Sequence, residues 1–90
     1  MLRKSEDIYN MTAKDFLKIA EAIESEIIEN RRWLHAHAET EFELKETTAF
    51  VKEKLSEIGC DFSDCGKCGI SAVIGKREGK TILLRADMDA

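Results

Sequence analysis

The sequence contains no proline and five glycines among its 90 residues, so breaks between helices and strands fall to glycine. It also lacks any apolar run near the roughly 20 residues that a membrane span requires. Residues 1–7 include basic side chains, but no apolar stretch follows them, which argues against a secretory signal. These absences speak against a membrane-spanning or secreted protein.

Basic residues are in the minority, and cysteines are few. Lysine and arginine together number 14 against 18 aspartates and glutamates, which gives a net charge of −4. Nucleic-acid binding favours a basic face, and no polybasic membrane patch is present. The three cysteines all lie within residues 60–68, and an odd number so closely spaced is a poor disulfide framework. We expect a cytoplasmic protein with no nucleic-acid or membrane partner.

The length allows one small domain at most, with a thin core. A hydrophobic content of 43% and a charged content of 36% suit a folded globular segment and argue against disorder. Residues 1–11 are polar and predict a frayed lead-in. Residues 12–90 carry the patterns of secondary structure.

Two amphipathic helices are predicted first. Thr12 and Asp15 have the spacing of a capping box, and apolar residues then recur at helical spacing, which predicts a helix over 13–37. Thr40 as a cap with Glu43 three residues later predicts the start of a second helix. Gly59 supplies the left-handed residue that ends it.

Strands follow the second helix. Residues 60–68 predict a short strand and a turn, and an apolar run from Ile70 to Ile74 predicts a second strand. Glycines bound a turn over 75–79, and residues 80–86 predict a third strand, so that 69–86 forms an antiparallel hairpin. The order of elements indicates an α/β fold.

Asp87 and Asp89 come directly after the apolar run of that third strand. Alternate residues of a strand share a face, so both carboxylates point the same way, roughly 7 Å apart. Ligands of α/β sheets usually bind at the carboxyl ends of strands. The pair could coordinate a metal, orient a metal-bound histidine, act as acid and base in glycoside cleavage, or simply end a strand at the surface.

The remaining metal-ligand residue types are less suggestive. Cys60, Cys65 and Cys68 have the spacing of an iron–sulfur motif, but a cluster or a zinc site needs a fourth ligand, so incidental thiols are the favoured interpretation. His35 and His37 are two residues apart on a helix, about 200° of rotation, and cannot chelate one metal from a regular helix.

Several segments together resemble the N-terminal part of the metal-dependent amidohydrolases of peptidase family M-twenty. The nearest branch resembles the N-acyl-amino-acid amidohydrolases, which include hippurate hydrolase and auxin-conjugate hydrolases. The similarity spans about residues 15–90, and its first and last blocks are the most specific. The matching positions are 31–39, Glu43, Thr47 or Thr48, Leu55, Gly59, Gly69-Ile70 and 84–90.

The resemblance implies a three-layer α/β/α catalytic domain, of which 12–90 would be an incomplete N-terminal portion. It implies two divalent metals, zinc or manganese, that activate water against an amide, and a possible homo-oligomer. Asp89 matches the aspartate that supports the metal site, as a ligand or by orienting one. Asp87 occupies a position where other branches have a histidine ligand, so a ligand role for Asp87 is not implied. The other ligands and the general-base glutamate lie further along in the family.

The first hypothesis is therefore that the chain is the N-terminal part of an enzyme that hydrolyses N-acyl amino acids or small peptides. These residues alone would be inactive and would not hold the two metals. A second is a small metal- or cluster-binding module built on the cysteines. A third is a non-catalytic interaction domain that shares the hydrolase front end. The acyl and amino-acid specificity stays open.

Overall fold

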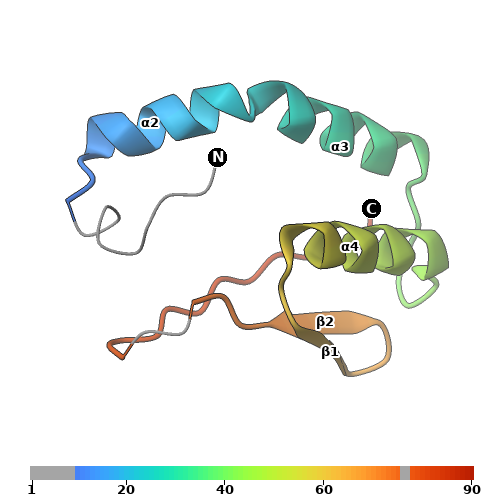
Figure 1. Ribbon diagram of the computed structural model, residues 1–90. Helices are drawn as coiled ribbons and strands as arrows, with labels where there is room; N and C mark the ends of the chain where they lie inside the picture. Colours follow the sequence, from blue (N-terminus) through green and yellow to red (C-terminus); the bar gives the residue numbers. More distant parts are fainter. Residues whose placement is uncertain (1–9, 76–77) are drawn as a thin grey trace. The chain divides into compact units, whose positions relative to one another are not determined.

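The computed structural model describes residues 10–75 and 78–90 (Figure 1). In this part of the chain, three helices precede a two-stranded antiparallel sheet, which agrees with the predicted α/β class. The chain divides into two compact units, one up to Trp33 and one from Leu34 to Ala90. No helix of the described residues has the length and apolar character needed to cross a bilayer. The predicted lead-in at 1–11 lies mostly outside the described residues.

The first unit consists of helix α2 (Ala13–Ala22) and most of helix α3 (Glu24–Ala36). The predicted capping box is confirmed, since the Thr12 hydroxyl accepts a hydrogen bond from the Asp15 N–H and the Asp15 carboxylate accepts one from the Thr12 N–H. The prediction of one continuous helix over 13–37 is wrong, because the helix is interrupted once. Ile23, with ψ near 5°, separates the two helices, and no glycine or proline accounts for the break.

The second unit is built on helix α4 (Lys45–Ile58) and on strands β1 (Phe62–Cys65) and β2 (Gly69–Ala72). The predicted end of α4 is confirmed, because Gly59 has a φ of 87° and the Cys60 N–H reaches back to the Leu55 carbonyl. The predicted start is wrong. The helix begins at Lys45 with Leu44 as its N-cap residue, so Thr40 and Glu43 form a turn before it instead of a capping box.

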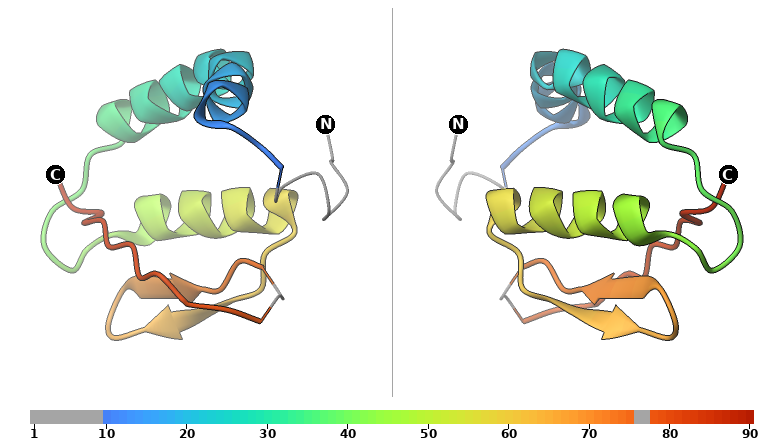
Figure 2. Two further views of the ribbon diagram at one scale, coloured as in Figure 1. Left: turned by 90° about the vertical axis from the view of Figure 1, so that its left-hand side faces the viewer. Right: turned by 90° about the vertical axis from the view of Figure 1, so that its right-hand side faces the viewer.

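Strands β1 and β2 form the hairpin, with Phe62 opposite Ala72 and Cys65 opposite Gly69. This confirms the predicted strand and turn within 60–68, whereas the second strand ends at Ala72, earlier than predicted. Helix α4 lies next to the hairpin (Figure 2). The Thr48 hydroxyl donates to the Cys68 carbonyl at 3.3 Å, and the Lys52 ammonium pairs with Asp64 at 2.7 Å. These contacts fix α4 on the hairpin.

The core of this unit is thin, as the length predicts. Among the described residues, Leu44 is the one buried apolar side chain and Thr47 the one buried polar side chain, each 4% exposed. Both lie at the N-terminal end of α4. The first turn of α4 is therefore the best-packed part of the described chain.

The prediction of a third strand over 80–86, and with it the hairpin over 69–86, is wrong. These residues adopt no regular secondary structure, and Ile82, Leu83 and Leu84 are 83%, 90% and 89% exposed. A strand forms only against a hydrogen-bonding neighbour, and an apolar one also needs cover on its faces. The 80–86 segment has neither here. The predicted turn at 75–79 includes residues 76–77, which lie outside the described residues.

Candidate functional site

The two aspartates singled out by the sequence lie on the irregular segment that ends the chain. The Asp87 carboxylate pairs with the Arg85 guanidinium at 2.8 Å, with both side chains largely exposed. Asp89 is exposed, and Met88 between them is half-buried. The prediction that the two carboxylates lie at the carboxyl end of a buried strand is wrong, because residues 80–86 do not form a strand.

A main-chain hydrogen bond holds this segment in place. The Ala90 N–H donates to the Glu39 carbonyl, with 2.7 Å between nitrogen and oxygen. Glu39 belongs to the loop between α3 and α4, and Figure 2 shows the end of the chain beside that loop. The peptide that follows Asp89 is thus attached to a residue 51 positions earlier in the sequence.

The side chain of Glu39 holds the start of α4 from the same loop. Its carboxylate accepts the Thr47 N–H at 2.7 Å and the Glu46 N–H at 3.2 Å. These are donors of the first helical turn, which have no partner within the helix. Glu39 thereby performs the capping role that the sequence had assigned to Thr40.

This capping changes the acidity of Glu39. The Thr47 N–H lowers the pKa of the Glu39 carboxyl below its ordinary value, because a hydrogen bond to the ionised form stabilises it. Partial burial opposes this shift, whereas the Thr47 side chain, the Glu46 N–H and the nearby His37 act with it. The ionised form is therefore the one that holds α4.

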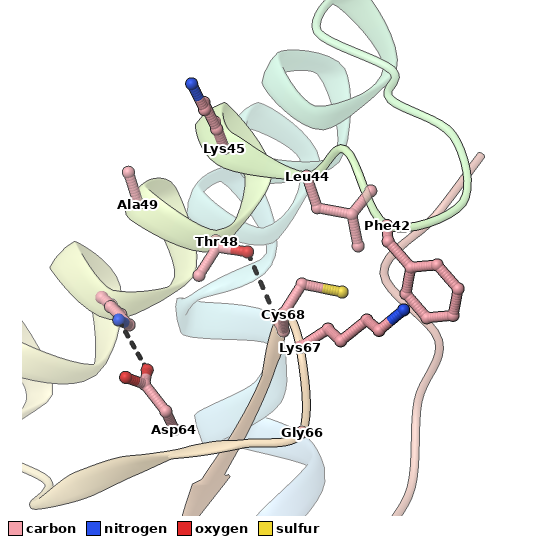
Figure 3. Close-up of a pocket in the computed structure, with 10 residues that line it drawn as sticks. Phe42, Leu44, Lys45, Thr48, Ala49, Asp64, Gly66, Lys67 and Cys68 are labelled. Carbon is pink, nitrogen blue, oxygen red and sulfur yellow. Dashed lines mark hydrogen bonds and ion pairs between the residues drawn. The ribbon is translucent and has the colours of Figure 1, made fainter.

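A shallow groove lies beside the two aspartates. It is bounded by the loop before α4, by the turn between β1 and β2, and by the end of the chain, and it is lined by Glu41, Phe42, Leu44, Cys68, Gly69 and residues 86–89. A second groove shares Phe42, Leu44 and Cys68 with it (Figure 3). There the Lys67 ammonium lies 4.7 Å from the centre of the Phe42 ring. The aspartates thus face a surface that is partly apolar.

Comparison with known proteins identifies relatives over most of the chain. It is 35% identical over 82 residues to an N-acyl-L-amino acid amidohydrolase of Geobacillus stearothermophilus, covering 89% of this chain. It is 38% identical over 92 residues to an N-acetyl-L-cysteine deacetylase of Bacillus subtilis, covering 91%. It is 39% identical over 72 residues to a thermostable carboxypeptidase of Saccharolobus solfataricus, covering 76%. The chain is amidohydrolase-like, of the M-twenty type.

The amidohydrolase-like chain spans 22% of the length of each of the first two relatives and 18% of the third. A similar stretch also occurs in a putative glutamate–cysteine ligase of Rhodococcus jostii, 40% identical over 68 residues that are 9% of that protein. No protein-family model matches the chain, and no solved structure matches it significantly.

The residues present do not by themselves fit a metal centre. Within residues 10–75 and 78–90, no three histidine, cysteine, aspartate or glutamate side chains converge as ligands would. Asp87 is engaged with Arg85, which leaves Asp89 as the carboxylate of the pair that is open to another partner. Cys60, Cys65 and Cys68 form no disulfide, and among the described residues they do not gather with other ligand residues into the cluster that the cysteine-based module would need.

Two features of this candidate site were missed by the sequence analysis. Glu39 and Arg85 stood within the matching blocks, but neither was given a role. The signal for Arg85 was available, since it precedes Asp87 by two residues and has the opposite charge. The signal for Glu39 was weaker, because a cap seven and eight residues before its donors lies outside the usual capping box.

Proposed function

We propose that this chain contributes to an enzyme that hydrolyses the amide bond of N-acyl amino acids or small peptides with the help of divalent metals. The named activities of the amidohydrolase and deacetylase relatives support this substrate class. The carboxypeptidase relative supports the extension to peptides. We also propose that the enzyme acts on a small-molecule substrate, lies in the cytoplasm and forms a homo-oligomer.

One geometric observation carries the proposal. The two sequence blocks on which the family resemblance depends most are 31–39 and 84–90, and their last residues, Glu39 and Ala90, are joined by a main-chain hydrogen bond. These two residues are far apart in the sequence, and the segment that Ala90 ends also lines a groove with both of its aspartates. Residues that serve one site are expected to converge in this way.

We assign different roles to the two aspartates. Asp89, whose backbone is fixed by the Glu39 loop, would bind a metal or orient a metal ligand. Asp87, whose carboxylate is paired with Arg85, would take no direct part in metal binding. Divalent metals would supply an activated water to attack the amide. Because the described residues lack a ligand set, the remaining ligands and the general base are not assigned within this chain.

The exposed segment at 80–86 fits a further part of the proposal. Its apolar residues Ile82, Leu83 and Leu84 have the composition of an interior strand, which is apolar on both faces. In a three-layer α/β/α domain such a strand would pair with neighbours and be covered by helices. We propose that 12–90 forms the N-terminal portion of such a domain.

The experiment uses the protein encoded by the complete reading frame that contains this chain. It is purified with zinc or manganese and mixed with N-acetyl-L-cysteine, N-acetyl-L-methionine, N-benzoylglycine and a dipeptide, and the free amine is measured. Release of amine that a chelator abolishes supports the proposal. Absence of release from all four substrates with both metals contradicts it.

A further inference from the structure

Glu39 accepts hydrogen bonds from two different segments, one set through its side chain and one through its main chain. Its carboxylate accepts the N–H groups of Glu46 and Thr47 at the start of α4. Its main-chain carbonyl accepts the N–H of Ala90. One residue therefore connects the best-packed turn of the described residues to the peptide that directly follows Asp89.

We propose that Glu39 is a positioning residue for Asp89, which acts by coupling the first turn of α4 to the end of the Asp87–Asp89 segment. The importance of this coupling for catalysis rests on the proposed function, whereas the coupling itself is a property of the fold. In this role Glu39, which lies in the first matching block, contacts neither substrate nor metal.

The surroundings of the contact explain why the coupling matters. The Asp87–Asp89 segment forms no strand, so sheet hydrogen bonds do not fix its backbone. The ion pair between Arg85 and Asp87 is internal to the segment and exposed, and so it does not anchor the segment to the rest of the chain. The bond from Ala90 to Glu39 joins it to another element. The half-buried Met88 gives a second, apolar attachment at the groove.

The neighbouring helix makes Glu39 a rigid support. Leu44 and Thr47, the two buried residues of the described part of the chain, bracket the turn whose N–H groups the carboxylate accepts. Because that turn is packed, the carboxylate is confined, and the carbonyl of the same residue is confined with it. Removal of the carboxylate should free the loop, and the Ala90 bond should then weaken although its own atoms are unchanged.

The test is amide hydrogen exchange of the 90-residue chain, followed residue by residue by NMR. In Glu39→Ala, exchange should accelerate at Glu46 and Thr47 and also at Ala90, by about fivefold or more at each, as expected when a hydrogen bond is weakened. Glu43→Ala removes a carboxylate from the same loop and should change exchange at Ala90 by less than about twofold. The amides of Phe62 and Ala72 in the hairpin serve as internal references.

Glu39→Gln is a control for general unfolding, because it keeps the length of the side chain and weakens both hydrogen bonds to the carboxylate. It should accelerate Ala90 exchange to a smaller extent and leave the hairpin references unchanged. If Glu46 and Thr47 lose protection in either variant while Ala90 exchanges as in the wild type, the coupling is refuted. The measurement requires no activity, so it can succeed or fail independently of the amidohydrolase assay.

Discussion

The guanidinium of Arg85 lies 2.8 Å from the carboxylate of Asp87, two residues further along the chain. The pair satisfies the charge of Asp87 locally, and both side chains remain exposed, 83% and 69%. Exposed ion pairs of this kind contribute little to stability. The two aspartates of the segment are therefore chemically unequal, although the sequence presents them as a matched pair.

The first prediction concerns Asp87. In the full-length protein, Asp87→Asn should keep kcat/KM for an N-acetyl amino acid within about fivefold of the wild type, because an exposed ion pair contributes at most about 1 kcal/mol. Initial rates over a range of substrate concentrations measure this. A loss of two orders of magnitude would show that Asp87 takes part in the site directly.

The second prediction concerns acid. The pKa of Glu39 is lowered in the folded chain, so its ionised form stabilises α4 fully above its unfolded pKa, which is about 4.3. That stabilisation is lost as the pH falls through the lowered folded value. Urea unfolding followed by circular dichroism from pH 6 to pH 3 should show a smaller decline in stability for Glu39→Gln than for the wild type. Identical declines would show that the cap contributes nothing.

The third prediction concerns the thin core. Leu44→Ala removes the one buried apolar side chain of the described residues and should reduce the free energy of unfolding by about 2 kcal/mol, the lower end for such a change. Ile58→Ala, at the other end of α4 and 71% exposed, should change it by less than about 0.5 kcal/mol. Equal effects of the two substitutions in urea unfolding would contradict the assigned core.

The fourth prediction concerns association. The exposed apolar run at 82–84 and the unpaired sheet edges of the hairpin should make the 90-residue chain self-associate at high concentration. Leu83→Glu should reduce association, whereas Thr81→Glu adds the same charge without removing an apolar side chain and should reduce it less. Sedimentation velocity measures both. A stable wild-type monomer at high concentration would argue against this account.

Local signals in the sequence predicted the elements that depend on near neighbours. The Thr12–Asp15 box and the Gly59 end of α4 each involve residues within five positions, and both are confirmed. The 80–86 strand failed because strand formation depends on a distant pairing partner, which an apolar run alone does not specify. The cap of α4 was misassigned because Glu39 reaches its donors across a loop, and spacing rules cover only adjacent positions.

The candidate site likewise has features that the sequence could predict and features that it could not. A functional role for residues 84–90 is a prediction from composition and resemblance, whereas their attachment to Glu39 joins atoms of residues 51 positions apart. No periodicity or local motif encodes such a contact. The inequality of Asp87 and Asp89 likewise depends on the orientation of Arg85, which a sequence does not give.

The central claim is that the segment fixed by Glu39 belongs to the active centre of an amidohydrolase. The most direct test is kcat/KM for an N-acetyl amino acid in the protein encoded by the complete reading frame, compared between Asp89→Asn and Asp61→Asn, an exposed aspartate elsewhere on the chain. The account predicts a loss of about 10- to 100-fold for Asp89→Asn, as for residues that support a metal site, and wild-type activity for Asp61→Asn. Full activity of Asp89→Asn would contradict it.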